Sequence, residues 1–414
     1  MNKLKRASYG FIIYAPVSLW QIKVKLKNII SCFLFIFLSV PIFGKGLTDT
    51  TIQPAAAYPD KFLGDLKGLR VGLIINQTSE SNGKSLLDVL ISRGIRVTKI
   101  FVPEHGFRGN EDAGAHIANG IDSATKLPVI SLYGANKKPT SAQLDDVDIM
   151  IYDLQDVGVR FYTYISTLQY CMEAAANTGK RFMVLDRPNP NGFYVDGPVL
   201  EKKHSSFVGM QPIPVVYGMT AGEYARMLVG EGWFAGAASL QLTVVPCRNY
   251  THSRKYILPV PPSPNLRTMD AIYAYPSLCL FEGTPVSVGR GTDKPFMQFG
   301  CPEFRGSYSY SFVPRSGYGA KKPPFEDKEC FGKVVTKMGF TNQMQLDWLL
   351  DAYKAHPQKD KFFTPFFTKL SGTNNLEAQI RDLKNAASIR QSRKKDIIRF
   401  KKIRKKYLLY PDFE

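Results

Sequence analysis

Three polar turns, each directly after a run of apolar residues, hold the side chains of this 414-residue sequence that could carry out chemistry. The first turn contains Glu104 and His105. The other two contribute Asp153, Asp156, Arg160, Tyr162, Asp186, Arg187 and Asn189. Carboxylates with aromatic neighbours suit glycosidic cleavage, which generally needs one carboxylic acid to protonate the leaving oxygen and a second group to stabilise or attack the oxocarbenium-like centre. Glu104 is the only glutamate in these turns, so it is the predicted general acid.

Each turn also has a purely structural interpretation. Asp153 or Asp186 could cap the segment that follows it, Arg160 could pair with either carboxylate, and His105 could tie down its own turn through backbone bonds. Three such turns together favour a site over three separate structural uses. We therefore take Glu104, His105, Asp153 and Asp186 as catalytic candidates and the other turn residues as substrate-binding candidates.

Further candidates lie outside these turns. The first apolar run ends at Asn76, and a later segment, Phe281 to Thr292, places one carboxylate and one guanidinium among glycines that permit close backbone approach. The additional substrate-binding candidates are Asn76, Asn265, Glu282, Arg290 and Thr292. Arg290 could bind an anionic ligand group in bidentate fashion, or it could pair with Glu282.

The elements that must position these residues alternate along the chain. Five strand-like runs cover 69–76, 95–102, 127–132, 147–153 and 181–186. Helix-like segments at 83–93, 141–145 and 164–178 separate them. This alternation predicts a parallel sheet covered by helices, an α/β fold in which ligands bind beyond the carboxyl ends of the strands. No GxGxxG or GxxxxGK[ST] pattern follows the first run, so no nucleotide or other cofactor is expected.

Composition shifts toward proline and glycine after Pro188, which predicts a second, smaller domain. We expect one domain over residues 60–200 and another over 201–414 that completes a cleft. Helices are predicted at 220–230, from Thr341 to about Ala355, and at 376–387.

The first 46 residues contain no acidic side chain, and Lys23, Lys25 and Lys27 lead into an apolar run from Ile29 to Phe43. This order predicts a cleaved signal peptide over residues 1–46, because the run is shorter than the ~20 residues that a spanning helix needs. A retained membrane anchor is the alternative. Export to the periplasm or the exterior is expected, with membrane contact only in transit.

The net charge of +19 does not predict nucleic-acid binding, because the positive charges concentrate at the two ends of the chain. The basic segment 390–406 is interpreted as a solvated helix face over an apolar stripe, with attraction to anionic polymer or lipid as the alternative. The cysteines after the predicted signal peptide are widely spaced and odd in number, which argues against a dense disulfide framework. The absence of CxxC or paired Cys/His spacing predicts no metal site. The sequence does not indicate an oligomeric state.

Eight segments, in order, resemble a bacterial family of exo-acting β-N-acetylmuramidases that was long catalogued as a domain of unknown function. They are VGLIINQTS from Val71, FVPEHGFRG from Phe101, DLQDVGVRFYTY from Asp153, LDRPNPNG from Leu185, DGPVL from Asp196, YGMTAGEYA from Tyr217, PPSPN from Pro261 and FEGTPVSVGRGTDKPF from Phe281. The resemblance implies a Rossmann-like domain with a smaller α+β C-terminal domain, an active site in the cleft between them, and the Glu of PEHG, here Glu104, as the catalytic residue.

The implied activity is release of N-acetylmuramic acid from the non-reducing ends of peptidoglycan fragments of the MurNAc-GlcNAc type. Such muropeptides or disaccharides are then the expected partners, and the lactyl carboxylate of muramic acid is an anion that Arg290 could bind. The second catalytic role stays open between Asp153, Asp156 or Asp186 and the substrate's own 2-acetamido group. Two rivals are an exported glycan-binding protein without catalysis and a metal-dependent hydrolase, the latter disfavoured because no HExxH spacing is present.

Overall fold

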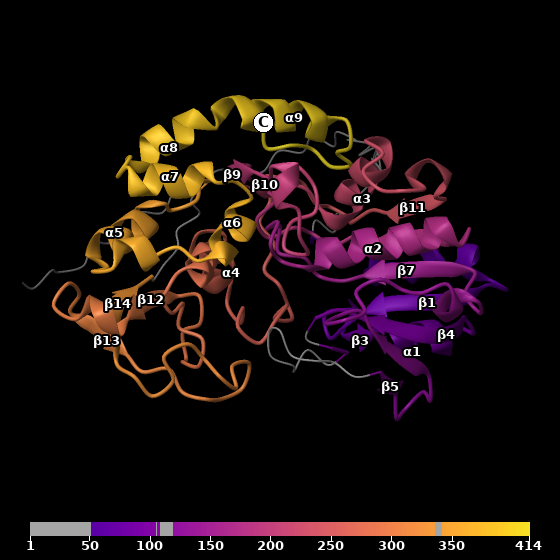
Figure 1. Cartoon of the computed structure of the whole chain (residues 1–414). Helices are drawn as coiled ribbons and strands as arrows, with labels where there is room; N and C mark the ends of the chain where they lie inside the picture. Colours follow the sequence, from indigo (N-terminus) through magenta and orange to yellow (C-terminus); the bar gives the residue numbers. More distant parts are fainter. Residues whose placement is uncertain (1–50, 105, 108–118, 336–341) are drawn as a thin grey trace, which may run out of the picture. The chain divides into compact units, whose positions relative to one another are not determined.

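The computed structural model describes residues 51–104, 106–107, 119–335 and 342–414. The predicted signal peptide and His105 lie outside these residues. The largest element is a seven-stranded sheet with the order β11-β8-β7-β1-β4-β6-β5 (Figure 1). Its strands are β1 (Arg70–Ile75), β4 (Arg96–Val102), β5 (Gly120–Ile121), β6 (Pro128–Ser131), β7 (Ile149–Asp153), β8 (Arg181–Leu185) and β11 (Leu242–Val245). All neighbours pair in parallel except β5, which runs antiparallel to β6.

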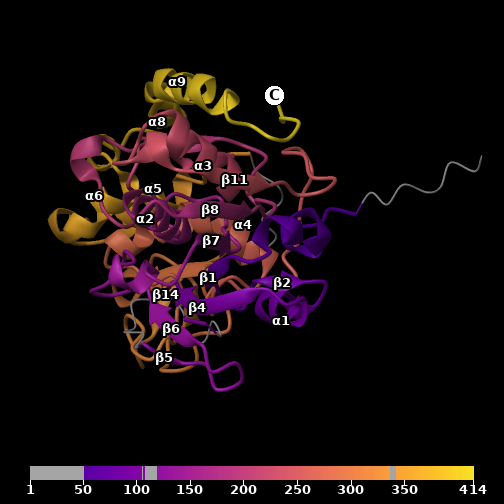
Figure 2. The ribbon, with the colours of Figure 1, turned by 90° about the vertical axis from the view of Figure 1, so that its right-hand side faces the viewer.

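Strands β1, β7 and β8 are mostly apolar because both faces of the sheet are covered. In β7, Met150 and Tyr152 join the core under α2 (Tyr164–Asn177) and α3 (Ala221–Gly230). Ile149 and Ile151 face the opposite core, under α1 (Leu86–Ser92). Figure 2 shows α1 and α2 on opposite sides of the sheet. The predicted Rossmann-like α/β architecture is confirmed, although the helix predicted at 141–145 is only a short 3-10 turn, η4 (Ala142–Leu144).

The predicted boundary at residue 200 does not coincide with the edge of this sheet. Strand β11 pairs with β8, and α3 is the crossover between these two parallel strands. A parallel pair requires such a crossover, so the segment through Val245 completes the sheet. The shift toward proline and glycine after Pro188 marks loops at the edge of the sheet and the hairpin of β9 (Asp196–Val199) and β10 (Pro214–Val216).

The C-terminal region is a smaller α+β unit. Its antiparallel sheet has the order β12-β14-β13, and helices surround it. The strands are β12 (Gln298–Cys301), β13 (Tyr310–Phe312) and β14 (Cys330–Val334). The helices are α4 (Met269–Leu278), α5 (Asp347–Ala355), α6 (Pro365–Ser371), α7 (Asn375–Arg381), α8 (Ala386–Ser392) and α9 (Lys394–Lys405).

Two predicted helices of this region differ in the structure. The helix expected from Thr341 begins at Asp347, and Thr341 lies outside the described residues. The helix expected over 376–387 is divided into α7 and α8, because Leu383 adopts a left-handed backbone (φ 54) between them. The side chain of Asn385 then caps α8 by accepting a hydrogen bond from the Ser388 amide (2.8 Å).

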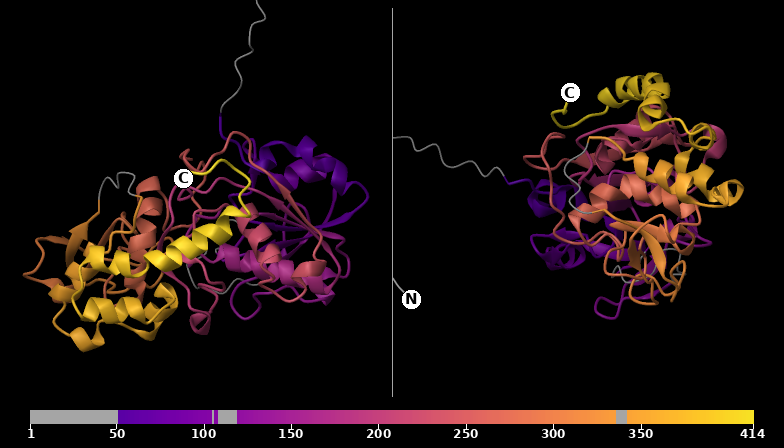
Figure 3. Two further views of the ribbon diagram at one scale, coloured as in Figure 1. Left: turned by 90° about the horizontal axis from the view of Figure 1, so that it is seen from above. Right: turned by 90° about the vertical axis from the view of Figure 1, so that its left-hand side faces the viewer.

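The basic segment forms α9, which returns from the C-terminal region to the sheet domain (Figure 3). Phe400 is buried as the predicted apolar stripe requires, but Ile398 is exposed. Arg404 is fully buried and donates to the Gly218 carbonyl (2.9 Å) and to Asp412. This helix is therefore built into the fold. Among the described residues, no helix is long and apolar enough to span a membrane.

Candidate active site

A pocket of about 860 Å³ opens beyond the carboxyl ends of β4 and β6 and is completed by the C-terminal region. Glu104 and Tyr133 follow these two strands, and Thr163 directly precedes α2. The opposite wall comes from α4, the 3-10 turn η7 (Cys279–Gly283), the loop 284–296 and the loop 319–325. Aromatic side chains supply much of the lining: Tyr133, Phe161, Tyr162, Phe207, Tyr275, Phe296, Phe325 and Phe366. Such rings suit the apolar face of a sugar.

Glu104 lines this pocket and is held by hydroxyl groups from the start of α2. The hydroxyl of Thr163 donates to Oε2 of Glu104 at 2.8 Å, and the Tyr164 hydroxyl lies 3.5 Å from the Glu104 carbonyl. Glu104 is only partly buried and belongs to the pocket lining, so a ligand in the pocket can reach it. His105, the second candidate in this turn, lies outside the described residues.

Asn76 and Tyr162 support the floor of the pocket. The Asn76 amide donates to the Tyr164 hydroxyl (2.8 Å) and its oxygen accepts from the Thr78 amide (2.9 Å). Asn76 is buried beneath the site rather than placed in its lining. Tyr162 does line the pocket, and its hydroxyl donates to the Pro262 carbonyl (2.9 Å), which joins the sheet domain to the PPSPN segment.

Asp153 and Arg187 form a buried bidentate ion pair and do not line the pocket. Nε and Nη2 of Arg187 lie 2.5 and 2.9 Å from the two carboxylate oxygens, and Asp153 is fully buried. Burial raises the pKa of Asp153, and the arginine opposes that shift. The pair links the ends of β7 and β8, so each charge has its partner inside the protein.

Asp186 is likewise fully buried and occupied by structural donors. Its carboxylate accepts from the Thr220 hydroxyl (2.7 Å), the Gly222 amide (2.8 Å) and the Tyr410 hydroxyl (2.6 Å). Thr220 and Glu223 form a capping box at this end of α3, so the carboxylate lies at a helix N-terminus. Burial raises the pKa of Asp186 to about 6. Asp186 therefore fastens α3 and the C-terminal segment to β8.

Asp156 is the third aspartate that does not line the pocket. One oxygen accepts from the Tyr217 hydroxyl (2.5 Å) and the Gly158 amide (2.6 Å), and the other has no hydrogen-bond partner among the described residues. Burial raises the pKa of Asp156 to about 6, although the bonds from Tyr217 and Gly158 oppose the shift. This carboxyl group stabilises its turn most when it is protonated.

Arg160 and Asn189 also have structural roles. Arg160 is fully buried and donates to four carbonyls, those of Pro198, Ile213, Leu370 and Ser371, which fastens the end of α6 to the β9-β10 hairpin. Burial lowers the pKa of Arg160 to about 9. Asn189 donates to the Met219 carbonyl (2.7 Å) and lies against Gly158, where a Cβ atom would stand 2.1 Å from its Oδ1. Only glycine fits at position 158, which also has φ +75.

Glu282 and Arg290 both line the pocket, and they are paired with each other. Nε of Arg290 lies 2.6 Å from Oε1 of Glu282, and the guanidinium lies over the Phe296 ring, 4.9 Å from its centroid. Burial acts to lower the pKa of Arg290, but the Glu282 carboxylate outweighs it and the pKa is raised. Pairing with Glu282 and binding of an anionic ligand are therefore compatible roles for Arg290, because the paired guanidinium is at the pocket wall.

Asn265 and Thr292 shape loops next to the pocket and are not among its lining residues. Asn265 is buried and donates to the Gly319 carbonyl (2.7 Å), which positions the loop 319–325. The Thr292 hydroxyl donates to the Gly289 carbonyl (2.7 Å) and accepts from the side chain of Gln298 (2.8 Å).

Several residues that line the pocket were not predicted from the sequence. They include Thr163, Tyr133, Phe207, Tyr275, Lys321 and Lys322. Thr163 follows Tyr162 within the DLQDVGVRFYTY segment, and this position next to a predicted site residue could have indicated that Thr163 belongs to the site. Lys321 and Lys322 lie in a loop that no motif marks, and only the packing of the C-terminal region brings them to the pocket.

Known protein families and a curated protein are similar to this chain over most of its length. Family models for the N-terminal and C-terminal parts of the exo-β-N-acetylmuramidase NamZ match residues 71–270 and 273–410. The peptidoglycan β-N-acetylmuramidase NamZ of Bacillus subtilis is 39% identical over 367 residues, which span 83% of this chain and 88% of the relative. The chain belongs to the exo-β-N-acetylmuramidase NamZ family. The resemblance drawn from the motifs is thereby confirmed.

Two solved structures of DUF1343 family proteins from Bacteroides fragilis share the fold of this NamZ family member. One is 46% identical with a TM-score of 0.81, and the other is 29% identical with a TM-score of 0.74. Each comparison covers 87% of this chain and 99% of the solved chain. The two NamZ family models meet within α4, so the N-terminal model includes β11 and the complete seven-stranded sheet.

The raised pKa of Asp156 predicts a pH-dependent stability. Its folded pKa of about 6 exceeds the ordinary 3.8, so the stabilising contribution is complete below pH 3.8 and is lost as pH rises through 6. Asp156→Asn keeps an acceptor for Tyr217 and Gly158 without this titration. The free energy of unfolding of the variant, relative to wild type, should increase by up to about 3 kcal/mol between pH ~4 and pH ~7.5. Urea unfolding at both pH values measures this, and an unchanged difference between the two proteins would contradict the assignment.

Proposed function

We propose that this chain is an exo-acting glycoside hydrolase that releases N-acetylmuramic acid from the non-reducing ends of peptidoglycan fragments. The observation that carries the proposal is Glu104, a partly buried carboxyl group supported by Thr163 at an aromatic-lined pocket. Membership in the NamZ family and the similarity to the B. subtilis peptidoglycan β-N-acetylmuramidase support the same activity.

In the proposed mechanism Glu104 protonates the glycosidic oxygen as the bond to the anomeric carbon breaks. Thr163 fixes the carboxyl group by its 2.8 Å hydrogen bond, and the aromatic walls hold the sugar ring and exclude water. After departure of the aglycone, Glu104 is a carboxylate and can accept a proton from the incoming water. The same group thus serves both steps.

We assign the attacking group to the substrate's own 2-acetamido oxygen. Asp153, Asp156 and Asp186 are buried and do not line the pocket. Glu282 does line it, but Arg290 neutralises its charge across 2.6 Å. Attack by the acetamido oxygen on the anomeric carbon forms a cyclic intermediate that water opens, and this route needs no second protein carboxylate as nucleophile.

Selectivity for muramic acid is assigned to the positive wall of the pocket. Arg290, Lys321 and Lys322 line the same pocket, and the lactyl group of muramic acid carries a carboxylate that N-acetylglucosamine lacks. A guanidinium can bind a carboxylate through two parallel hydrogen bonds, whereas a lysine acts as a point charge. Arg290 has a fixed position between Glu282 and Phe296, which favours it over the two lysines as the contact for the lactyl carboxylate.

The role of Glu104 predicts a large loss of turnover on a natural substrate. Glu104→Gln should lower kcat for MurNAc-GlcNAc by about 10²–10⁴-fold, because the amide cannot protonate the leaving oxygen. Release of free N-acetylmuramic acid, followed by chromatography, measures this. The exposed Glu329→Gln, outside the pocket, is the matched control and should retain wild-type turnover. Wild-type protein that is folded and binds the disaccharide without releasing product would instead establish a glycan-binding protein.

The role of Arg290 predicts a change in substrate preference. Wild type should hydrolyse a chromogenic β-MurNAc glycoside and leave the β-GlcNAc analogue nearly untouched. Arg290→Gln should reduce this preference in kcat/KM by about 10-fold or more, since a charge-assisted bidentate contact is lost. Arg290→Lys keeps the charge and should lie between the two. An unchanged ratio in Arg290→Gln would exclude this side chain as the carboxylate contact.

Export of the protein is part of the proposal, because the substrate lies outside the cytoplasm. It is supported by the acid-free N-terminal 46 residues, with lysines ahead of a short apolar run. Cell fractionation followed by N-terminal sequencing should find a shortened chain in the periplasm or the medium. Full-length protein retained in the cytoplasm would contradict export.

A further inference from the structure

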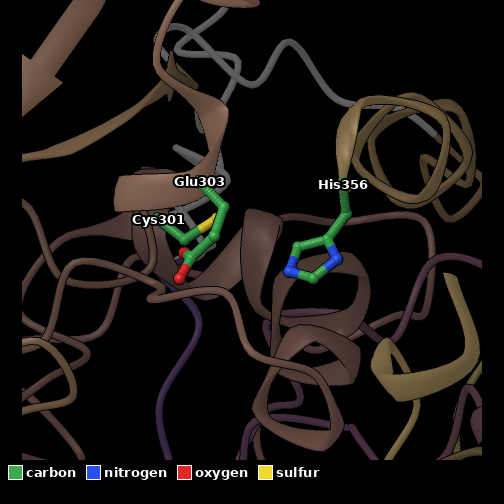
Figure 4. A group of neighbouring side chains, drawn as sticks. All are labelled: Cys301, Glu303 and His356. Carbon is green, nitrogen blue, oxygen red and sulfur yellow. The ribbon is translucent and has the colours of Figure 1, made fainter. Parts of the chain in front are cut away.

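Three potential metal ligands of different chemistry lie together in the C-terminal region, outside the lining of the pocket. Cys301 is the last residue of β12, Glu303 lies in the 3-10 turn η8 (Pro302–Phe304), and His356 directly follows α5. One ligand atom from each of the three residues lies within 4.8 Å of the other two. Figure 4 shows a ring nitrogen of His356 directed toward Cys301 and Glu303.

The surroundings hold His356 in this orientation. Its Nδ1 atom lies 3.2 Å from both the carbonyl oxygen and the amide nitrogen of Gln358. In the tautomer in which Nδ1 donates to that carbonyl, Nε2 is available to a metal ion. Metal-binding histidines commonly make such a second contact with the backbone through the other ring nitrogen. The rings of Phe304 and Phe362 pack against the imidazole, with centroids 6.1 and 5.4 Å away.

The exposure of the three side chains also suits a bound ion, because two of them lie inside the protein and one lies at its surface. Cys301 is fully buried and His356 is 3% exposed, whereas Glu303 is exposed. The two inner ligands are therefore fixed, and the outer one can move to admit or release an ion.

A thiolate, an imidazole and a carboxylate form a donor set that Zn²⁺ accepts. In a tetrahedral site with metal–ligand distances of about 2.0–2.3 Å, the ligand atoms stand about 3.3–3.8 Å apart. The three ligand atoms all lie within 4.8 Å of one another, and rotation of the exposed Glu303 side chain can shorten its own distances to the other two. Water would supply the fourth ligand.

We propose that Cys301, Glu303 and His356 bind one Zn²⁺ ion that fastens the end of β12 to the end of α5. The Cys301 thiol releases its proton to solvent as the Zn–S bond forms, and no other bond changes. Since none of the three residues lines the pocket, the ion acts on the stability of the C-terminal region and takes no part in hydrolysis. Cys301 and Glu303 are two residues apart, but His356 follows 53 residues after Glu303, which gives no recognisable zinc spacing, so the sequence predicted no metal site.

Titration of Zn²⁺ into the chelator-treated full chain, against a chromophoric chelator, tests the proposal without any measurement of hydrolysis. Wild type should bind about one equivalent. Co²⁺ in its place should give the visible absorption of a tetrahedral site and a thiolate charge-transfer band. Cys301→Ser, Glu303→Gln and His356→Gln should each weaken Zn²⁺ binding by about 10-fold or more and remove the rise in Tm that Zn²⁺ produces in wild type.

Matched controls separate ligation from general damage. Cys330→Ser changes another buried cysteine, on the neighbouring strand β14, and Glu329→Gln changes an exposed glutamate of the same region. Both should bind Zn²⁺ as wild type does. Glu303→Gln alters an exposed side chain, so circular dichroism should show that it remains folded. The proposal is overturned if wild type binds no Zn²⁺, or if folded Glu303→Gln and Cys301→Ser bind it as tightly as wild type.

Discussion

A carboxylate that is removed from water needs hydrogen-bond donors inside the protein, and this requirement organises the carboxyl edge of the main sheet. Asp153 at the end of β7 is paired with Arg187, and Asp186 after β8 receives donors from α3 and from Tyr410. Removing one partner from such a buried group would leave its desolvation uncompensated, so these contacts hold the turns in one arrangement. The candidate active-site pocket then forms beside them, beyond β4 and β6, and Glu104 belongs to its lining.

Hydrogen bonds of other buried polar side chains connect the two parts of the chain. Arg160 is fully buried and donates to carbonyls from the β9-β10 hairpin and from the end of α6. Tyr410 and Arg404 bring the C-terminal segment back to the sheet domain. The wall of the pocket that carries Glu282 and Arg290 is consequently held opposite Glu104 by contacts that never touch the ligand.

The sequence predicted the sheet well, because strands buried on both faces appear as largely apolar runs, such as the IMIY stretch within 147–153. It also identified Glu104, Tyr162, Glu282 and Arg290, which all line the pocket. The sequence singled out Glu104 as the general acid but could not exclude Asp153 and Asp186 from catalysis, because all three occupy positions at or just beyond the carboxyl ends of strands. The structural role of an aspartate depends on partners that are distant in sequence, such as Thr220 and Tyr410 for Asp186. The pairing of strand β11 with the sheet also could not be predicted from a local sequence pattern.

The most direct test of the claim that Glu104 is the general acid is the dependence of its effect on the leaving group. Hydrolysis by wild type and Glu104→Gln should be compared on MurNAc-GlcNAc and on β-MurNAc glycosides of increasingly acidic phenols. A phenolate that leaves without protonation needs no acid, so the loss in kcat/KM should shrink steadily as the phenol becomes more acidic. An equal loss on every substrate would contradict the account and would assign Glu104 to binding or folding instead.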